Sequence, residues 1–312
     1  MDSVYTTTIT TEARRRGIGI RVLDPVTPIF ELRHGRRRIR CYNALTDRVG
    51  AATFHLAQNK ASANHFLRQH GFPVPDQELF QDLAQANRFL ARHRSIVVKP
   101  CQQWGGRGVS VDVRTRADLQ AALRRAKHFE DTIVLESCVR GVDQRLILVN
   151  GRYVAAIQRT PAAVVGDGRR TLRALILRQN WVERQVDPSH VIPLDAETQR
   201  NLRTLGMRLD TVPAAGRRIQ VRLTSNYHTG GSVDIVTDAV DRGLVRTATR
   251  IARLFQLPMV GIDFLVDKPR RKHWVIEISP DMAISPPEGE EVARRFLDYL
   301  FPETRGRTGR RS

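Results

Sequence analysis

Two lysines and a glycine-rich loop are the residues best suited to bind phosphate in this sequence. Of its 51 basic residues 46 are arginine and 5 are lysine, so the few lysine positions stand out. Lys99 ends the apolar, β-branched run 95–99, and Gly105, Gly106 and Gly108 follow. Glycine lets backbone N–H groups approach a polyphosphate, and a lysine at the strand end can reach the same charge.

This loop lacks the GK[ST] of a Walker loop, and it joins two predicted strands instead of opening a helix, which argues against a dinucleotide-binding turn. We interpret it as a flexible flap over phosphate, with an ordinary turn as the alternative.

Asp263 and Glu277 could form a metal site. Asp263 lies near the end of one predicted strand, 259–266, and Glu277 in the centre of the next, 273–278. If these strands are antiparallel neighbours, the two carboxylates can converge on one hard cation such as Mg²⁺. The alternative is that each acid faces solvent. Asn226 and the glycines at 230 and 231 form a polar loop, for which an ordinary turn is again the alternative.

The elements that must position these residues follow from hydrophobic periodicity and turn signals. Residues 1–16 read as a polar stretch without an element. Asn150-Gly151 is a strong hairpin signal, and Thr115 with Asp118 has the spacing of a helix cap. The predicted strands are 18–23, 29–33, 39–41, 95–99, 109–113, 132–136, 145–149, 153–158, 219–223, 259–266 and 273–278, and the predicted helices are 58–69, 81–92, 115–127, 171–182, 240–255 and 289–300.

Composition sets the broad class. The 312 residues are 41% hydrophobic and 27% charged, a balance that supports a folded core and excludes wholesale disorder. No apolar run reaches membrane-spanning length and the N-terminus has no apolar signal core, so we expect a cytoplasmic protein that binds no membrane. Cys41, Cys101 and Cys138 show no CxxC spacing, which argues against disulfides and structural zinc.

The net charge of +19 attracts polyanions and raises the question of nucleic-acid binding. However, the arginines occur in short separated clusters, only 6% of residues are aromatic, and no nucleic-acid-binding motif is present. We therefore expect at most non-specific binding.

Taken together, these motifs resemble the ATP-grasp ligases over roughly residues 56–304. Within that superfamily the sequence is most similar to the amino-acid ligase branch of N-acetylglutaminylglutamine, cyanophycin and bifunctional glutathione synthetases, and closest to the first. The resemblance rests on Lys60, Val97 to Pro100 with the flap, Leu135-Glu136, Gly141 to Arg145, Arg159 to Gly168, Leu209 to Gly216, Asn226 to Gly231, and Gly261 to Asp263 with Glu277.

The resemblance implies an α+β ATP-grasp fold, in which two subdomains with antiparallel sheets clasp ATP. The expected divisions are a small N-terminal α/β segment (1–55), a nucleotide-lid subdomain (56–140), a C-terminal subdomain with the metal and substrate site (141–304) and a disordered basic tail (305–312).

It also implies a role for each residue. Lys60 and Lys99 would hold the ATP phosphates beneath the flap glycines. The adenine would lie against Glu136, Ser137 and Val139. Asp143 would accept hydrogen bonds from the ribose hydroxyls. Asp263, Glu277 and Ser279 would bind Mg²⁺ or Mn²⁺. Arg145, Arg159 and Arg222 would face the substrate carboxylate and acyl-phosphate, with Asn226 near the transferred phosphate.

The expected activity is ATP-dependent carboxylate–amine ligation of amino-acid or dipeptide substrates through an acyl-phosphate. The alternatives are a different amino-acid or peptide ligase of the same branch, an ATP-binding protein without turnover, and a nucleic-acid binder. The oligomeric state stays open, with a homo-oligomer as one option.

The sequence departs from the family pattern at the metal motif. Ser279 stands where the family has asparagine after the metal-binding glutamate, and Pro280-Asp281 follows where the family has Pro-Gly. A serine hydroxyl is a shorter ligand than an amide, so Asp281 is a second candidate for that coordination position. Asn59 replaces the usual aspartate before Lys60.

Overall fold

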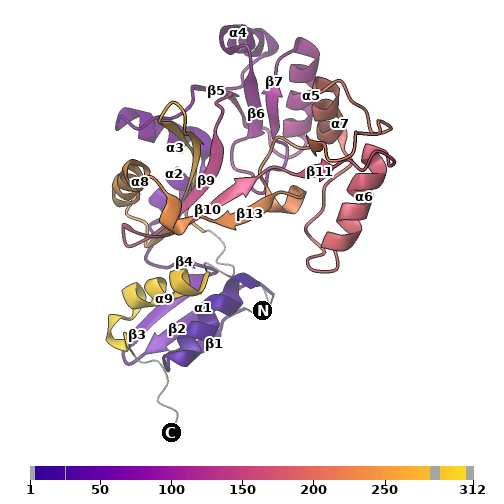
Figure 1. Cartoon of the computed structure of the whole chain (residues 1–312). Coiled ribbons are helices and arrows are strands. Elements are labelled where there is room, and N and C mark those ends of the chain that lie inside the picture. The colour runs from indigo at the N-terminus through magenta and orange to yellow at the C-terminus, as the bar shows by residue number, and fades with distance from the viewer. Residues whose placement is uncertain (1–3, 25, 282–288, 307–312) are drawn as a thin grey trace. The chain divides into compact units, whose positions relative to one another are not determined.

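The computed structural model describes residues 4–24, 26–281 and 289–306 (Figure 1). The chain divides into two compact units, which are described separately. Unit 1 contains residues 1–74, 144–157 and 235–312, and unit 2 contains residues 75–143 and 158–234. The chain passes between the units four times: after Val74, within strands β9 (Val142–Val149) and β10 (Arg152–Thr160), and at the end of β13 (Ser232–Ile235).

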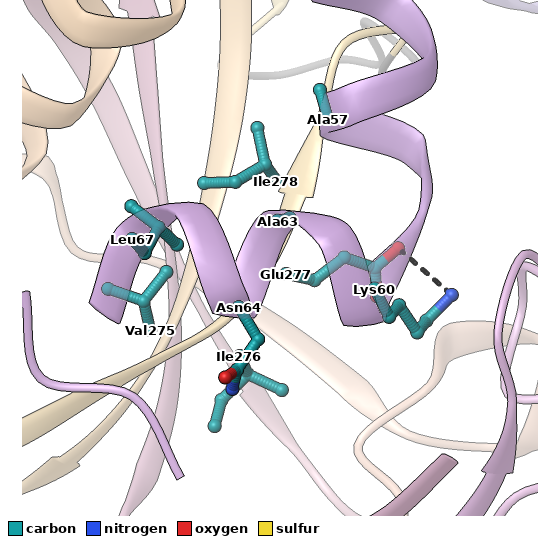
Figure 2. A pocket seen from close by; sticks show the side chains of 9 residues that line it. All are labelled: Ala57, Lys60, Ala63, Asn64, Leu67, Val275, Ile276, Glu277 and Ile278. Atoms are coloured by element: carbon teal, nitrogen blue, oxygen red, sulfur yellow. Dashed lines mark ion pairs between the residues drawn. The ribbon is translucent and has the colours of Figure 1, made fainter. Parts of the chain in front are cut away.

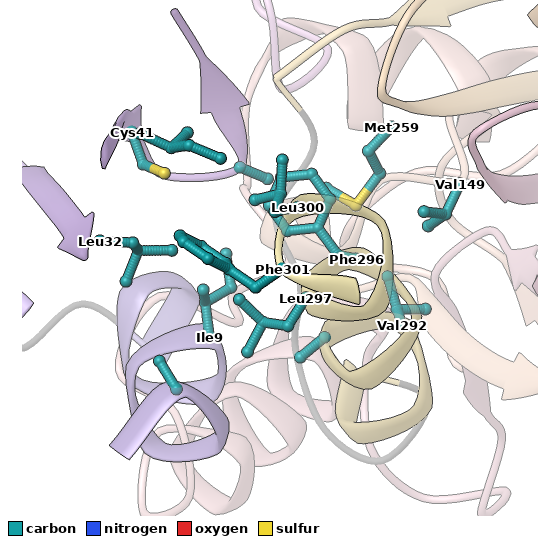
Figure 3. Packing of buried hydrophobic residues seen from close by; sticks show 14 of the residues in the cluster. Ile9, Leu32, Cys41, Val149, Met259, Val292, Phe296, Leu297, Leu300 and Phe301 are labelled. Atoms are coloured by element: carbon teal, nitrogen blue, oxygen red, sulfur yellow. The ribbon is translucent and has the colours of Figure 1, made fainter. Parts of the chain in front are cut away.

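The first part of unit 1 is a four-stranded antiparallel sheet that α1 and α9 cover (Figure 1). Its core contains Ile9, Leu32, Phe296 and Phe301 (Figure 3). The terminal regions of the sequence therefore fold together. The elements are α1 (Val4–Arg15), β1 (Gly19–Val22), β2 (Ile29–His34), β3 (Arg37–Tyr42), β4 (Leu45–Thr46), α9 (Gly289–Leu300) and η3 (Pro302–Thr304).

Helix α1 corrects the prediction that residues 1–16 hold no element. The threonines of α1 have low intrinsic helix propensity, so the sequence pattern did not indicate a helix. Ile9 and Ala13, four residues apart, are fully buried, and Thr10 Oγ1 donates to Thr6 O at 2.9 Å. Arg16 binds Asp298 of α9 with Nη1 at 2.7 Å. Packing against α9 thus stabilises a helix that propensity alone does not predict.

The second part of unit 1 joins helices α2 (Ala51–Gln58), α3 (Lys60–Gln69) and α8 (Arg242–Phe255) to a sheet with β14 (Met259–Asp267) and β15 (Lys272–Ser279). The strand order is β13-β10-β9-β14-β15. Asn150 and Gly151 have φ of 49° and 65°, as a type I′ hairpin requires, so the predicted turn is confirmed.

The predicted helix 58–69 is α3, and the sequence reading missed α2 before it. The two helices meet at Asn59, which ends α2 and caps α3 by accepting from Ser62 N at 2.9 Å. This cap places the start of α3 at Lys60, two residues after the start of the predicted range.

Unit 2 contains a four-stranded sheet, a two-stranded sheet and their helices. The sheet orders are β5-β8-β6-β7 and β11-β12. Thr115 caps α5 by accepting from Asp118 N at 3.1 Å, which confirms the predicted cap. The elements are β5 (Gln77–Leu79), α4 (Leu83–His93), β6 (Ile96–Pro100), β7 (Ser110–Val113), α5 (Arg116–Lys127), β8 (Ile133–Ser137), β11 (Ala163–Val165), α6 (Leu172–Glu183), α7 (Ala196–Thr204), β12 (Arg218–Gln220) and η1 (Tyr227–Thr229).

Helix α7 lies in the segment up to Gly216 for which the sequence predicted a polar stretch without an element. Its inner face is polar, because Glu197, Arg200 and Asn201 are all at most 9% exposed. Arg200 Nη2 donates to Glu197 Oε2 at 2.9 Å, and Arg125 of α5 binds the same carboxylate. A helix that buries charged pairs has no apolar stripe to reveal it. Strands β4, β5, β11 and β13 were also missed, and each is at most four residues long.

The remaining expectations concern cysteines, membranes and the tail. Cys41, Cys101 and Cys138 are free thiols, as predicted. None of the helices in the described ranges is long and apolar enough to span a bilayer. Most of the tail predicted to be disordered, 307–312, lies outside the described residues.

His273 is a half-buried histidine of unit 1 that should make stability depend on pH. Burial lowers the pKa of its imidazole, whereas Asp241 opposes the shift. The ring lies edge-on to Phe264 at 5.8 Å, and its Nε2 has no hydrogen-bond partner among the described residues.

Because the pKa is lowered on folding, the unfolded chain binds this proton more readily, and stability falls as pH drops below about 6.5, the usual histidine pKa. We expect His273→Phe to reduce the difference in unfolding free energy between pH 8 and pH 5.5, measured by urea denaturation. The exposed His65→Phe is the control. An unchanged difference in His273→Phe would contradict this prediction.

Candidate functional site

Asp263 and Glu277 lie directly opposite each other on the antiparallel strands β14 and β15. The condition set for a shared site, that the two strands are antiparallel neighbours, is therefore met. Asp263 is buried, whereas the Glu277 side chain is 34% exposed. A bulge after Asp263 shifts the register by one residue, so the ladder is interrupted beside the two acids and resumes at Phe264.

Arg145 on β9 binds Asp263 through both branches of its guanidinium. Nε donates to Oδ1 at 2.6 Å and Nη2 to Oδ2 at 2.9 Å, and Nη2 also lies 3.3 Å from Ser279 Oγ. The fork matches a planar carboxylate and fixes its orientation. Ser279 thus lies beside Asp263, and its hydroxyl oxygen accepts a hydrogen bond from Arg145. Asp281 lies in the turn after β15.

Lys60 brings a second cation to this cluster (Figure 2). It is the first residue of α3, its side chain is 8% exposed, and its Nζ lies 3.9 Å from Glu277 Oε1. A small pocket lies between α3 and β15, and Asn64, one turn after Lys60, lines it. Unit 1 therefore holds two opposed carboxylates with a lysine and an arginine against them.

In unit 2, Lys99 and Glu136 form a buried ion pair. Lys99 Nζ lies 2.8 Å from Glu136 Oε2, and the residues are 4% and 3% exposed. Gln77 Nε2 of β5 also donates to this carboxylate. Lys99 and Glu136 extend from the neighbouring strands β6 and β8. The lysine predicted to bind phosphate and the acid predicted to lie beside adenine are thus in direct contact.

Ser137 and Val139 follow on β8 and the segment after it. Ser137 Oγ accepts from Asp76 N at 3.0 Å, so its hydroxyl holds the chain that leads into β5. Val139 is partly exposed. These contacts do not show that Ser137 or Val139 binds a ligand.

The glycine loop adopts a conformation that needs glycine. Gly105, Gly106 and Gly108 have φ of 69°, 72° and 71°. A Cβ at Gly108 would lie 2.8 Å from Pro100 Cγ, so the loop also packs tightly at its base. Trp104 at the tip is 62% exposed, with the Arg107 guanidinium 4.2 Å from its ring centre.

Asn226 lies against this loop. A Cβ placed on Gly106 would be 3.7 Å from Asn226 Cβ and 3.8 Å from its Nδ2. Asn226 Oδ1 accepts from His228 N at 2.8 Å, which orients the amide. The sequence therefore brings the flap and the 226–231 loop together, although they are far apart along the chain.

The other predicted arginines are engaged in ion pairs. Arg159 donates from Nε and Nη2 to Asp143 Oδ1 at 3.0 and 2.8 Å. Arg222 is buried, and its Nη1 donates to Asp195 Oδ1 at 2.5 Å and Thr198 Oγ1 at 3.1 Å. The sequence reading missed Asp195 and Gln77 as partners. The N-cap spacing from Asp195 to Thr198 was the one available signal for Asp195.

The donor chemistry of unit 1 fits Mg²⁺ bound to a nucleotide. Mg²⁺ in such sites usually takes one or two carboxylates and completes its shell with phosphate oxygens and water. Asp263 and Glu277 supply two carboxylates on facing strands. Within the described ranges no group of three or more His, Cys, Asp or Glu forms a metal cage, so a dedicated all-protein site is absent there.

Residues 59–180 match the family model of the prokaryotic glutathione synthetase ATP-grasp domain. The chain is 30% identical over 315 residues to cyanophycin synthetase from Trichormus variabilis, covering 95% of this chain and 35% of that protein. It is 28% identical over 313 residues to the glutathione biosynthesis bifunctional protein GshAB from Listeria innocua, covering 93% and 40%. The chain thus spans well under half of these relatives' length.

Among solved structures, a bifunctional glutathione synthetase from Pasteurella multocida aligns with a TM-score of 0.63 at 23% identity, over 96% of this chain and 43% of that one. A D-alanine–D-alanine ligase from Bacillus anthracis aligns with a TM-score of 0.52 at 11% identity, over 81% and 68%. With the family match, these similarities show that the chain has the predicted α+β ATP-grasp fold.

Proposed function

We propose that this chain is an ATP-dependent carboxylate–amine ligase that joins amino-acid substrates through an acyl-phosphate. The observation that carries the proposal is the direct opposition of Asp263 and Glu277 with Lys60 and Arg145 against them, in a chain with the ATP-grasp fold. The names of the relatives, cyanophycin synthetase and a glutathione biosynthesis protein, support synthesis from amino acids.

The mechanism follows from the negative charge of the carboxylate substrate and of the ATP phosphates. A carboxylate is a poor electrophile, so its oxygen first attacks the γ-phosphorus of ATP and ADP leaves. The amine nitrogen then attacks the acyl carbon, and the carbon–oxygen bond to phosphate breaks to leave an amide. When bound, Mg²⁺ would neutralise charge on the phosphate oxygens during the transfer.

The residues of the chain would bind and orient the reactants. Lys60 and Lys99 would bind phosphates, Glu136 to Val139 the adenine, and Asp143 the ribose. Arg145, Arg159 and Arg222 would present guanidinium groups to the carboxylate and acyl-phosphate, whose geometry suits bidentate donors. The flap over the phosphates would exclude water, which otherwise hydrolyses the acyl-phosphate.

The finer proposal is that the substrates resemble those of N-acetylglutaminylglutamine synthesis. It rests on the resemblance of the segments 13–18, 30–35 and 300–304 to that enzyme. The alternatives are glutathione-like or cyanophycin-like ligation, or ATP binding without turnover.

Release of ADP and phosphate across a panel of amino acids, N-acetylated amino acids and dipeptides, with product mass, tests the function. Amide formation from glutamine-type substrates supports the finer proposal. Product from other pairs favours an alternative ligase. ATP binding with no product from any pair contradicts ligation.

Shortening the flap should uncouple the reaction. We expect replacement of Trp104 to Arg107 by two glycines to leave ATP hydrolysis but lower the yield of amide per ADP, because water enters. Trp181→Ala, which removes an exposed tryptophan on α6, is the control. The ratio of amide to ADP is the measurement, and an unchanged ratio would show that the flap is only a turn.

Ser279→Asn should lower the Mg²⁺ concentration that gives half-maximal activity. An amide oxygen reaches further than the serine hydroxyl, and one added neutral ligand is worth roughly 1.5 to 3 kcal/mol, or about tenfold or more in metal affinity. Ser232→Asn on exposed β13 is the control. A wild-type protein that is inactive at high Mg²⁺, with activity restored by Ser279→Asn, would instead identify an ATP-binding protein without turnover.

A further inference from the structure

His190 lies between α6 and α7 and is held at both ring nitrogens. It is 8% exposed. Its Nδ1 lies 3.1 Å from Glu183 Oε2, at the end of α6, and its Nε2 lies 3.0 Å from the carbonyl oxygen of Gly231. The ring therefore connects α6 to the 226–231 loop.

The contact with Gly231 fixes which ring nitrogen of His190 donates. A backbone carbonyl oxygen can only accept a hydrogen bond, so Nε2 carries a proton and donates to Gly231 O. The ring also stacks on Tyr227, with centroids 4.3 Å apart and planes at 11°. The neighbouring polar groups pair among themselves: Ser189 Oγ lies 2.7 Å from Asp187 Oδ1 and 3.2 Å from His228 Nδ1.

The 226–231 loop fits closely around this contact. Gly231 N donates to Asn226 O at 3.0 Å, and a Cβ at Gly231 would lie 2.8 Å from Thr160 O. A Cβ at Gly230 would lie 2.2 Å from Ile192 Cγ1. Ile192 is held in turn by Asn180 of α6 through two hydrogen bonds of 2.8 and 2.9 Å. The loop thus packs closely against Thr160 and against Ile192 of the segment after α6.

We propose that His190 is the positioning residue that fixes the 226–231 loop, and with it Asn226, against Gly106 of the flap. The proposal rests on the proposed function and deepens it, because Asn226 lies where the flap would cover the transferred phosphate. His190 itself contacts no reacting group. It acts through the buried Nε2–H bond to the Gly231 carbonyl.

Steady-state kinetics and the ¹⁵N NMR spectrum of the His190 ring together test the positioning role of His190. We expect His190→Phe, which keeps a ring on Tyr227 but has no donor, to lower kcat about tenfold with little change in KM for ATP, as loss of one buried hydrogen bond predicts. His190→Gln, whose amide can still donate, should recover part of kcat. Glu183→Gln should cost less than about threefold, because a neutral ring can still donate from Nε2. His93→Phe, at a partly buried histidine of α4, should match wild type.

The spectra of the wild-type protein and of Glu183→Gln should both show His190 protonated at Nε2. A ring without a proton at Nε2 in wild type, or an unchanged kcat in His190→Phe, overturns the proposal. If wild type turns over no substrate pair, the proposed function fails, while the spectrum still decides which nitrogen of His190 donates.

Discussion

Glu277→Gln should abolish ligation while leaving the fold intact. Glu277 is partly exposed and its contact with Lys60 is 3.9 Å long, so loss of its charge should alter stability little. Activity should fall by more than about a hundredfold, because even groups that only orient a metal ligand are worth ten- to a hundredfold. Phosphate release at saturating Mg²⁺ measures the effect.

The matched control for this substitution is Asp267→Asn on the same hairpin. Asp267 ends β14 opposite Lys272 and pairs with Arg270 at 3.0 Å. We expect near wild-type turnover from it. Comparable losses in both variants would show that the hairpin needs its charges for folding, and full activity in Glu277→Gln would remove Glu277 from the site.

Lys99→Met should damage stability and ATP binding together. The substitution leaves Glu136 buried without its cation, which typically costs about 3 to 5 kcal/mol. Nucleotide affinity should fall by about tenfold or more, because a charge-assisted bond to phosphate is lost. Urea denaturation and calorimetry with ATP measure the two effects.

The double variant Lys99→Met/Glu136→Gln separates the two roles. Replacing both members of a buried ion pair with neutral groups of similar size is often neutral for stability, so the fold should recover. ATP binding should stay weak. Lys127→Met, at an exposed residue of α5, is the control. A stable double variant that binds ATP as tightly as wild type would make Lys99 a structural partner of Glu136 only.

The sequence predicted most of the elements that position the candidate site. Two apolar strands close in sequence were enough to predict the strands that carry Asp263 and Glu277, and the glycines at 105, 106 and 108 were enough to predict the flap as a loop between strands. These features are local, so periodicity and turn chemistry reveal them.

The contacts between distant segments could not be read in this way. Arg145 reaches Asp263 and Ser279 across 118 and 134 residues of chain, and the Lys99–Glu136 pair depends on strand order. Helix α7 was not predicted because its buried face is charged. Helix α1 was not predicted because its threonines disfavour a helix until α9 packs on it. Tertiary packing decided each of these cases.

Transfer of oxygen-18 tests the central claim most directly. A carboxylate donor from the active substrate pair is labelled in both oxygens and converted with ATP and Mg²⁺, and the phosphate and nucleotide products are analysed by mass. The acyl-phosphate route predicts ADP and one labelled oxygen in each phosphate, because the attacking carboxylate oxygen leaves with phosphorus. Label in AMP, or amide formed with unlabelled phosphate, would contradict it.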